Sequence, residues 1–397
     1  MTDQTVPRVR VHLDSSRSYD IKIGAGALER LGEVSRGALS PHARRIVVVS
    51  NRRVFDLYGA GAVRALRSAG FNVAQWLMGD GERYKSLLTA GRSLGFLAEN
   101  ELERSDAVMA LGGGVVGDLA GFVAAVYLRG VAFIQVPTTL LAQIDSSVGG
   151  KTAVNTPAGK NMIGAFHQPR TVLIDVRTLR TLPAREMTAG WCEAIKQGAV
   201  GSRKLYDQTC RLLAAWKTFS GVLHEAKKDA DEQVSEIERG LAKLIAAQCA
   251  FKAGIVAGDE REEESRTDYR SRRVLNFGHT IGHALESVTA YKRFRHGEAV
   301  GYGMLAAAEI SVRLGLIDAS ALKSLRAAVQ LAGRLPRADD LDHESILRLL
   351  RLDKKVVGGH VQWVLLERLG RARIVSGSEI PTRVVRDAIT AALQSST

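Results

Sequence analysis

Three of the nine histidines in this 397-residue chain lie within one 18-residue stretch. His279 and His283 are four residues apart, so a helix would project both from one face. His296 follows thirteen residues after His283. Two imidazoles on one helix face, a third from a following loop and one carboxylate form the ligand set that divalent zinc favours. For the first two histidines alone a hydrated helix face is the better explanation, but the third favours a metal site.

A second unusual stretch, EMTAGWCEAIK, covers residues 186–196. Glu186, Glu193 and Lys196 recur at helical spacing and fall near one face. A solvated face with a Glu193–Lys196 ion pair is one interpretation. The neighbours of Glu193 are mainly apolar, however, and a carboxylate in such a setting needs a partner. A metal ion would be such a partner.

A glycine-rich turn, GGGVVGD at residues 112–118, follows a short apolar run. It matches GxGxxG, in which glycines let a pyrophosphate approach the backbone at a helix N-terminus. The match is imperfect because the turn lies more than a hundred residues into the chain, and no acidic residue closes a following strand. A tight turn that needs glycine is the alternative. In a second loop, Asp80–Lys85, Glu82 can accept ribose hydroxyls and Lys85 can meet phosphate.

The longest segment rich in glycine and polar residues runs from Pro137 to His167. Its chemistry-bearing side chains are Asp145, Lys151, Asn155, Lys160, Asn161 and His167. The sequence predicts a loop that grips phosphate and hydroxyl oxygens. Single lysines on loops are usually plain surface, so this prediction depends on their shared setting.

Strand and helix patterns alternate through the first half of the chain. Val9–Leu13 and Tyr19–Ile23 alternate apolar and polar residues, which predicts a hairpin. Buried parallel strands are predicted over Arg45–Ser50, Phe71–Leu77, Asp106–Leu111, Val131–Val136 and Thr171–Val176. Helices are predicted over Ala60–Ala69 and Ser86–Asn100. This alternation predicts a Rossmann-like parallel sheet with helices on both faces, in a first domain of residues 1–182.

From Pro183 onward the pattern is mainly helical, so we expect a second, helical domain of residues 183–397. Helices are predicted over Ala184–Val200, Lys204–Trp216, Gln233–Gly254, Thr280–Ser287, Gly297–Leu314 and Ala319–Leu331. A hairpin of Val361–Leu366 and Ala372–Ser376 and a last helix, Arg383–Gln394, complete the chain. The predicted class is therefore α/β plus all-α.

Composition narrows the functional classes. Hydrophobic residues make up 46% and charged residues 24% of the chain, as in a globular protein with a full core. The net charge of +13 comes from dispersed basic residues with few aromatics, which disfavours nucleic acid and suits an anionic substrate. The start shows no secretory signal pattern, and the most apolar run, Leu119–Leu128, is too short to span a membrane. Three cysteines form no CxxC pair, so we expect a cytoplasmic protein with reduced thiols.

Several long segments together resemble the 3-dehydroquinate synthase family of sugar phosphate cyclases. They are GGGVVGDLAGF, RGVAFIQVPTTLLAQIDSSVGGKTAVN, GKNMIGAFHQP, EMTAGWCEAIK, LNFGHTIGHALE, HGEAVGYGM and DKKVVGG. The similarity runs from RSYDIKIGAG near the N-terminus to at least Gly359. The interval between Glu193 and His279 is longer than is usual for the family, which we interpret as longer helices or a surface loop.

The resemblance implies a role for each matching position. It implies zinc or cobalt on Glu193, His279 and His296, which replaces the pair suggested by spacing, because His283 then lies on the substrate side. NAD contacts are implied for Asp80, Glu82, Lys85, Gly113, Gly114, Val115, Val116, Gly117, Asp118, Thr138, Thr139, Lys151, Lys160, Thr178 and Thr181. Substrate contacts are implied for Arg129, Lys151, Asn161, Lys252, Arg272 and one of Lys354 and Lys355. Further catalytic positions are Lys196, His283, Asp145, Lys151, Glu260 and Asn276. In the family, the arginine matching Arg129 reaches the phosphate of a neighbouring subunit, which implies a homodimer.

The implied reaction converts 3-deoxy-D-arabino-heptulosonate 7-phosphate to 3-dehydroquinate and phosphate, a step of the shikimate pathway. NAD oxidises one carbinol transiently, phosphate leaves, the ketone is reduced again, and the ring closes by an aldol step. A cyclase acting on sedoheptulose 7-phosphate is the nearest alternative, but Lys252, Arg272 and Asn276 match the family that binds a carboxylated substrate. A metal-dependent polyol dehydrogenase is a second alternative, which the lysine-bearing segment 137–167 disfavours. A basic scaffold or nucleic-acid binder is a third.

Overall fold

The computed structural model describes residues 7–14, 17–225, 232–263, 265–351, 356–357 and 360–394. The chain divides into two compact units. The first contains Met1–Leu182 and also Ala226–Ala257, and the second contains Pro183–Glu225 and Gly258–Thr397. The chain therefore returns to the first unit once, whereas the sequence predicts two domains, 1–182 and 183–397, that follow one another without a return.

A seven-stranded sheet forms the centre of the first unit, in the order β1-β2-β9-β6-β5-β3-β4. Its strands are β1 (Arg8–Val11), β2 (Tyr19–Gly24), β3 (Arg45–Asn51), β4 (Asn72–Met78), β5 (Ala107–Gly112), β6 (Ala132–Pro137) and β9 (Thr171–Asp175). Only β1 and β2 pair antiparallel, which confirms the predicted hairpin and parallel strands. Because β3 pairs with β4 on one side and β5 on the other, the strand order reverses between β3 and β5. Ligands of such sheets bind at the carboxyl ends of the strands at this point.

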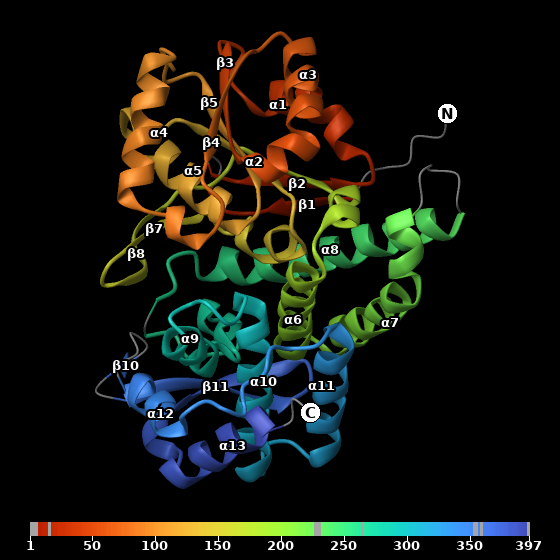
Figure 1. Cartoon of the computed structure of the whole chain (residues 1–397), viewed down its shortest axis with the longest axis vertical. Helices are drawn as coiled ribbons and strands as arrows, with labels where there is room; N and C mark the ends of the chain where they lie inside the picture. The colour runs from red at the N-terminus through yellow and green to blue at the C-terminus, as the bar shows by residue number, and fades with distance from the viewer. Residues whose placement is uncertain are drawn as a thin grey trace. The chain divides into compact units, whose positions relative to one another are not determined.

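Helices cover both faces of the sheet, as predicted (Figure 1). Successive strand residues point to opposite faces. Ile46 and Val48 of β3 belong to the core beneath α1 (Leu31–Ala38) and α3 (Ala60–Ser68). Val47 and Val49 belong to the core beneath α4 (Leu87–Glu99) and α5 (Gly114–Val126). The alternation along a single strand thus defines two cores.

The segment 137–167 is not one loop. Its second half forms an antiparallel hairpin of β7 (Lys151–Thr156) and β8 (Gly159–Phe166). β7 packs against α5, and Val154 is fully buried there. The loop prediction was wrong for these residues because the small and polar side chains of the hairpin hide the alternation that marks a strand.

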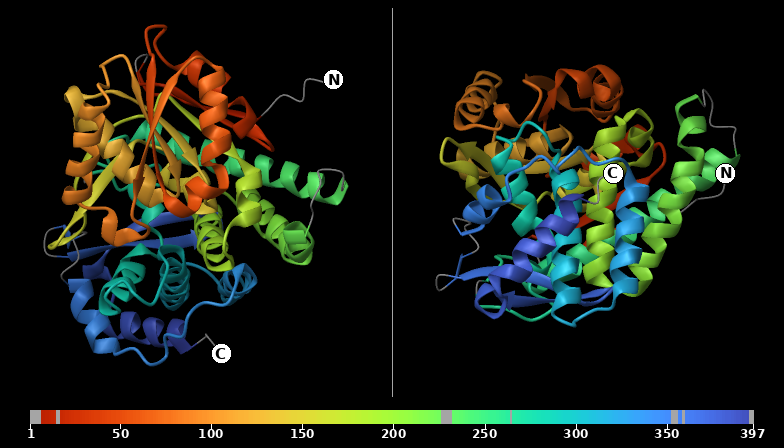
Figure 2. Two further views of the ribbon diagram at one scale, coloured as in Figure 1. Left: turned by 45° about the horizontal axis from the view of Figure 1, so that its top comes forward. Right: turned by 60° about the horizontal axis from the view of Figure 1, so that its bottom comes forward.

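Helices dominate the second unit, as predicted, and a small sheet accompanies them (Figure 2). The helices are α6 (Ala184–Gly201), α7 (Arg203–Glu225), α9 (His279–Val288), α10 (His296–Arg313), α11 (Ala319–Ala332), α12 (His343–Arg351) and α13 (Thr382–Gln394). The strands are β10 (Val356–Val357), β11 (His360–Arg368) and β12 (Arg371–Ser376). α10 packs against α6, α9, α11, α13 and β11 and is therefore the central helix of this unit.

α8 (Glu232–Gly258) is the one helix of the described residues that is long and apolar enough to cross a membrane. Of its most apolar 18-residue segment, 56% is buried inside the structure. Residues such as Leu241, Ile245 and Cys249 are almost fully buried. Such burial is typical of a core helix in a soluble protein.

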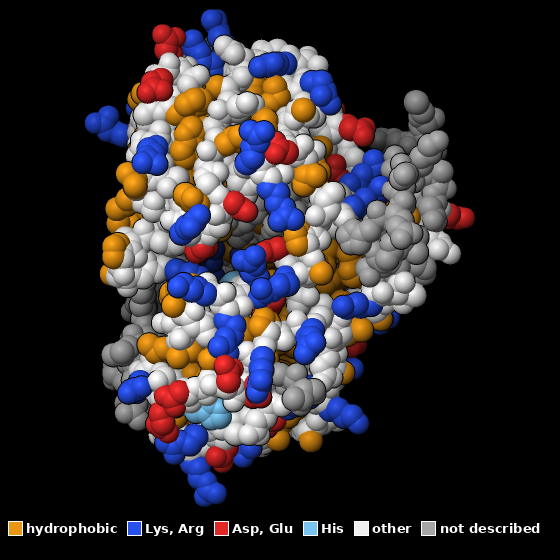
Figure 3. Space-filling view, viewed as in Figure 1, with side chains coloured by type: hydrophobic (Ala, Val, Ile, Leu, Met, Phe, Trp, Pro, Cys, Tyr) orange, Lys and Arg blue, Asp and Glu red, His pale blue; other side chains and the backbone are white. Residues whose placement is uncertain are grey.

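Basic side chains are spread over most of the face in Figure 3, among acidic and apolar ones.

Candidate metal and substrate site

Two of the predicted ligands begin helices in the second unit. His279 is the first residue of α9 and His296 the first residue of α10. Gly278, the N-cap of α9, has φ of 79° in the left-handed region. That conformation favours glycine and ends the preceding turn sharply. The backbone geometry thus places both imidazoles at helix starts.

Glu193 lies in the middle of α6, where it is completely buried. Its Oε1 lies 3.9 Å from His279 Nε2 and 3.7 Å from His296 Nε2. Lys196 Nζ lies 2.6 Å from the other oxygen, Oε2. Lys196 thus pairs with Oε2, whereas Oε1 accepts no hydrogen bond within the described residues. A buried carboxylate in this state is expected to gain a cationic ligand.

Hydrogen bonds occupy the other nitrogen of both rings. His279 Nδ1 lies 3.3 Å from the carbonyl oxygen of Phe277, and His296 Nδ1 lies 3.0 Å from Glu286 Oε2. Because both partners are acceptors, each Nδ1 carries a proton and each Nε2 is left as the metal-binding nitrogen. Tetrahedral ligands at about 2.1 Å from zinc are about 3.4 Å apart, close to the separations found here. The residues present therefore fit a divalent metal.

The carboxylates beside the His296 ring change its pKa. Burial lowers the pKa of the ring, but the hydrogen bond with Glu286 and the charges of Glu286 and Glu193 outweigh burial. The pKa of His296 is therefore raised above its ordinary value. In the protein without metal, a proton competes for this ring.

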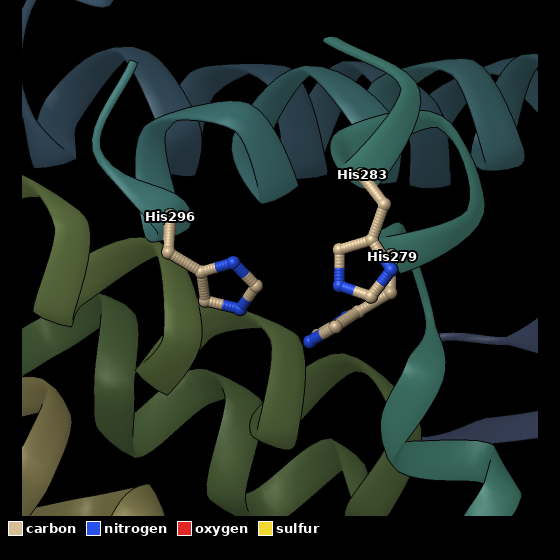
Figure 4. A group of neighbouring side chains, drawn as sticks. All are labelled: His279, His283 and His296. Carbon is tan, nitrogen blue, oxygen red and sulfur yellow. The ribbon is translucent and has the colours of Figure 1, made fainter. Parts of the chain in front are cut away.

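His283 completes a group of three converging imidazoles (Figure 4). One ring nitrogen from each of His279, His283 and His296 lies within 4.8 Å of the others. The ring centroid of His283 is 5.4 Å from that of His279 and 5.7 Å from that of His296. The structure thus brings together all three histidines predicted from spacing, and Glu193 adds the carboxylate.

Close backbone contacts fix the helices that carry these ligands. A Cβ added at Gly303 of α10 would lie 1.9 Å from the carbonyl oxygen of Gly278. A Cβ at Gly297 would lie 2.0 Å from the carbonyl oxygen of Ala189 in α6. Since real atoms cannot approach so closely, only glycine allows α10 to lie this near to α9 and α6. The positions of the metal ligands therefore depend on glycine at positions 297 and 303.

Three more predicted residues of the second unit lie near η7 (Arg272–Asn276), a short 3-10 helix that packs against α6. Arg272 is buried and donates through Nη1 to the carbonyl oxygen of Glu260 at 2.7 Å. Asn276 Nδ2 donates to Glu262 Oε1 at 3.1 Å. Arg272 and Glu260 therefore lie together.

In the first unit, the glycine turn lies where the strand order reverses. Gly112 ends β5 and Gly113 is the N-cap of α5. A Cβ at Gly113 would lie 3.0 Å from Thr139 Cγ2, and one at Gly114 would lie 3.1 Å from Ser146 Oγ. The first turn of α5 has no charged side chain, so its amide groups and helix dipole favour an anion there.

Lys85 lies at the centre of a charged cluster beside this helix. It is 4% exposed, and its Nζ lies 2.9 Å from Asp118 Oδ2, 3.1 Å from Glu82 Oε1 and 2.7 Å from Asn161 Oδ1. Burial lowers the pKa of Lys85, but the charges of Asp118 and Glu82 outweigh it and raise the pKa overall. For Glu82, burial raises the pKa, but Lys85 and other partners outweigh it and lower the pKa overall. Lys85 and Glu82 are thus ionised at neutral pH, whereas burial raises the pKa of Asp118 above its ordinary value.

Replacing Lys85 by methionine is expected to lower the free energy of unfolding by about 3–5 kcal/mol at pH 7, because two partly buried carboxylates lose their cation. The difference in the free energy of unfolding between the native chain and this variant should increase as the pH rises from 4 to 7. In the native chain the lowered pKa of Glu82 adds stability above its unfolded pKa, whereas the unpaired carboxylates of the variant take up protons on folding. Urea unfolding at several pH values measures the difference, with the exposed Lys323→Met as control. A loss below about 1 kcal/mol contradicts a buried ionised cluster.

Asp145 and Lys252 form a second buried pair of the first unit. Asp145 lies in η5 (Ala142–Ser146), a π-helical turn, and Lys252 lies on α8. Lys252 Nζ is 2.8 Å from Asp145 Oδ1 and 2.6 Å from its carbonyl oxygen. The charge of Lys252 also acts on Asp118. The return of residues 226–257 to the first unit thus brings Lys252 to this group.

The remaining predicted residues are more scattered. Thr138 is buried and donates its amide to the carbonyl oxygen of Gly112, which lies beside the glycine turn. Thr178 and Thr181 lie in the 3-10 helix η6 (Val176–Thr181), where both contact the hydroxyl of Tyr58. Lys151, Lys160 and Arg129 lie on the surface or partly so, and Arg129 has a left-handed φ of 64°. Lys354 and Lys355 lie outside the described residues.

Sequence reasoning missed Glu286 and the role of Asn155. Glu286 lies seven residues after His279 on the same helix, and its apolar neighbours were the available signal. Asn155 Nδ2 donates to Glu82 Oε1 at 2.8 Å, and its Oδ1 accepts from the amide of Asn161 at 3.0 Å. Asn155 was named only as part of a loop, because nothing in the sequence pairs it with Glu82.

Comparison with known proteins connects this geometry to one family. The family model for the N-terminal part of 3-dehydroquinate synthase matches residues 75–189, and that for the C-terminal part matches residues 190–356. The 3-dehydroquinate synthase of Pelotomaculum thermopropionicum is 45% identical over 371 residues, which is 93% of each chain. That of Nostoc punctiforme is 41% identical over 376 residues, 94% of this chain and 96% of the relative.

Solved structures show the same fold at lower sequence identity. A 2-deoxy-scyllo-inosose synthase in complex with carbaglucose-6-phosphate, NAD+ and Co2+ has a TM-score of 0.77 at 23% identity, covering 97% of this chain and 99% of that chain. A 2-epi-5-epi-valiolone synthase from Streptomyces hygroscopicus with NAD+ and Zn2+ has the same TM-score and identity, with the same coverage. A glycerol dehydrogenase from Schizosaccharomyces pombe has a TM-score of 0.61 at 15% identity, covering 95% and 89%.

Proposed function

This chain belongs to the 3-dehydroquinate synthase family, and we propose on that basis that it converts 3-deoxy-D-arabino-heptulosonate 7-phosphate to 3-dehydroquinate and phosphate. The observation that carries the proposal is the buried Glu193 carboxylate, which faces two histidines whose Nδ1 atoms are already engaged. The relatives indicate the substrate, because the 3-dehydroquinate synthases compared are 40–45% identical to the chain, whereas the valiolone synthase is 23% identical.

Glu193, His279 and His296 hold the metal in this proposal, and NAD lies along the Asp80–Lys85 loop and the glycine turn. When bound, NAD supplies the transient oxidation and re-reduction, and the metal supplies Lewis-acid polarisation of a substrate oxygen. Relatives of the same fold were solved with NAD+ and with Co2+ or Zn2+. The NAD contacts are those that the resemblance implies, and the bare helix N-terminus of α5 supports a pyrophosphate there.

The chain's own residues bind and orient the substrate. Lys252 and Arg272 are buried cations of the kind that bind carboxylate and phosphate oxygens. Lys151, Asn161, Arg129 and one of Lys354 and Lys355 complete the proposed anion contacts. His283, beside the metal ligands, is proposed to contact the substrate, and Asp145, Lys196, Glu260 and Asn276 are the other proposed active-site residues. NAD is regenerated in each cycle, so no net redox change occurs.

The proposal places this soluble enzyme in the cytoplasm as a homodimer. Its three cysteines are free thiols in the structure, which is typical of a reducing compartment. Arg129 is exposed on a left-handed turn, a position from which a side chain can reach a neighbouring subunit.

Phosphate release with NAD and zinc tests the function. Two substrates are compared: 3-deoxy-D-arabino-heptulosonate 7-phosphate and sedoheptulose 7-phosphate. We expect rapid release from the first alone, loss of release with a chelator, and no accumulation of NADH. Release from the second alone would assign the chain to the sedoheptulose cyclases and remove the proposed roles of Lys252 and Arg272. Accumulation of NADH with a simple polyol, without phosphate release, would indicate a dehydrogenase.

A further inference from the structure

We propose that Glu286 is a positioning residue, which holds the His296 ring so that Nε2 faces Glu193 and the metal. This inference goes beyond the ligand set and rests on the proposed function for the presence of the metal. Glu286 does not face the metal itself: its Oε2 is bonded to His296 Nδ1, on the side of the ring away from Nε2.

Glu286 connects the two helices that carry the histidine ligands. It lies on α9, two turns after His279, whereas His296 begins α10. Its side chain is only 4% exposed, and the distance from Oε2 to Nδ1 is 3.0 Å. A hydrogen bond to a buried carboxylate is partly shielded from water and therefore restricts the ring.

The two histidines differ in how much they need such support. The His279 side chain is 11% exposed and its Nδ1 faces a carbonyl oxygen two residues away, so the local backbone orients the ring. The His296 side chain is 35% exposed, so less packing surrounds it. Its orientation therefore depends on a side chain from another helix.

A carboxylate does more for His296 than a neutral acceptor does. A carboxylate accepts a stronger hydrogen bond from Nδ1–H than an amide oxygen does, and it makes the opposite nitrogen a better ligand. Glutamine preserves the size and an acceptor oxygen but not the charge. Glutamine and leucine at position 286 thus separate orientation from charge.

The nearby Glu298 is not available for this task. It is completely buried, its two oxygens accept from Arg185 Nε and Nη2 at 2.8 and 2.5 Å, and Oε2 also accepts from the amide of Arg295. It fixes the start of α10 rather than the ring. Glu286 is therefore the carboxylate that orients His296.

Zinc affinity of the purified full chain, measured by competition with a chromogenic chelator, tests the inference without turnover. We expect Glu286→Gln to weaken zinc binding about tenfold and Glu286→Leu to weaken it up to about 100-fold. The visible absorption of the cobalt-loaded protein should change in intensity with both variants. Glu309→Gln changes a largely buried glutamate on α10 that pairs with Arg326, and should leave zinc affinity unchanged within about twofold.

A double-mutant cycle with His296→Ala shows whether Glu286 acts through His296. In that background the effect of Glu286→Gln should fall below about twofold, because the ring it orients is gone. A tenfold effect that persists without His296, or wild-type affinity in both Glu286 variants, overturns the inference. If the wild-type chain itself does not bind zinc, the proposed metal site fails, which is distinct from failure at Glu286 alone.

Discussion

Replacing Glu193 by glutamine is expected to reduce phosphate release about 1000-fold or more. A catalytic metal contributes several kcal/mol to the transition state, and each 1.4 kcal/mol is about a factor of ten. The carboxylate is the anionic member of the proposed ligand set, and its Oε1 is within 3.9 Å of both histidine Nε2 atoms. Metal content by atomic emission and phosphate release are measured on the same preparation.

The buried Lys196 requires a second variant, because it loses its partner when Glu193 is neutralised. Glu193→Gln alone should lower the free energy of unfolding by about 3–5 kcal/mol, the usual result of breaking a buried ion pair. Replacing both residues, as Glu193→Gln with Lys196→Met, should restore most of the stability but not the metal or the turnover. Retention of stoichiometric metal by Glu193→Gln, with normal release, contradicts the proposed ligand.

Gly303→Ala is expected to destabilise the fold by about 3 kcal/mol or more, because overpacking of a fixed contact forces the backbone to move. The added Cβ would lie 1.9 Å from the carbonyl oxygen of Gly278, which cannot rotate away as a side chain can. Movement of α10 away from α9 would also separate His296 from His279. Urea unfolding and zinc affinity should therefore both decline.

Gly254→Ala provides the matched control for this substitution. Gly254 also lies inside a helix, α8, but nothing lies within 4 Å of an added Cβ. Alanine there should stabilise the protein by about 0.5–1 kcal/mol, since it lowers the entropy of the unfolded chain. Equal unfolding midpoints for the two variants would contradict the close contact between α9 and α10.

Much of the fold could be predicted because its strands and helices have strong local patterns. The run Ile46–Val49 contains only β-branched apolar residues, which suit a strand buried on both faces, so the structure agrees with the prediction. The hairpin Lys151–Phe166 was not predicted, because its small and polar residues show no clear alternation and its packing on α5 is a long-range contact. The return of α8 to the first unit likewise depends on long-range contacts, such as that of Lys252 with Asp145.

The candidate site shows the same division between local and long-range information. The spacing of His279 and His283 predicts one helix face, and the structure has both rings beside His296. The apolar neighbours of Glu193 indicated a metal partner, but its grouping with these histidines came from the resemblance, because no spacing rule connects residues 86 positions apart. Glu286 was missed because its partner lies on a different helix, and helical periodicity describes only neighbours on one helix.

The glycine contacts affect how loss-of-function variants of this protein should be interpreted. A random mutagenesis screen that scores growth would find Gly278, Gly297 and Gly303 as intolerant of change as His279 and His296. None of these glycines has a side chain that could touch a substrate, and a Cβ at any of them would meet a carbonyl oxygen within 2.9 Å. Intolerance to substitution therefore identifies two classes of position here. One class supplies ligand atoms to the metal, and the other must have no side chain because a Cβ would clash with the backbone.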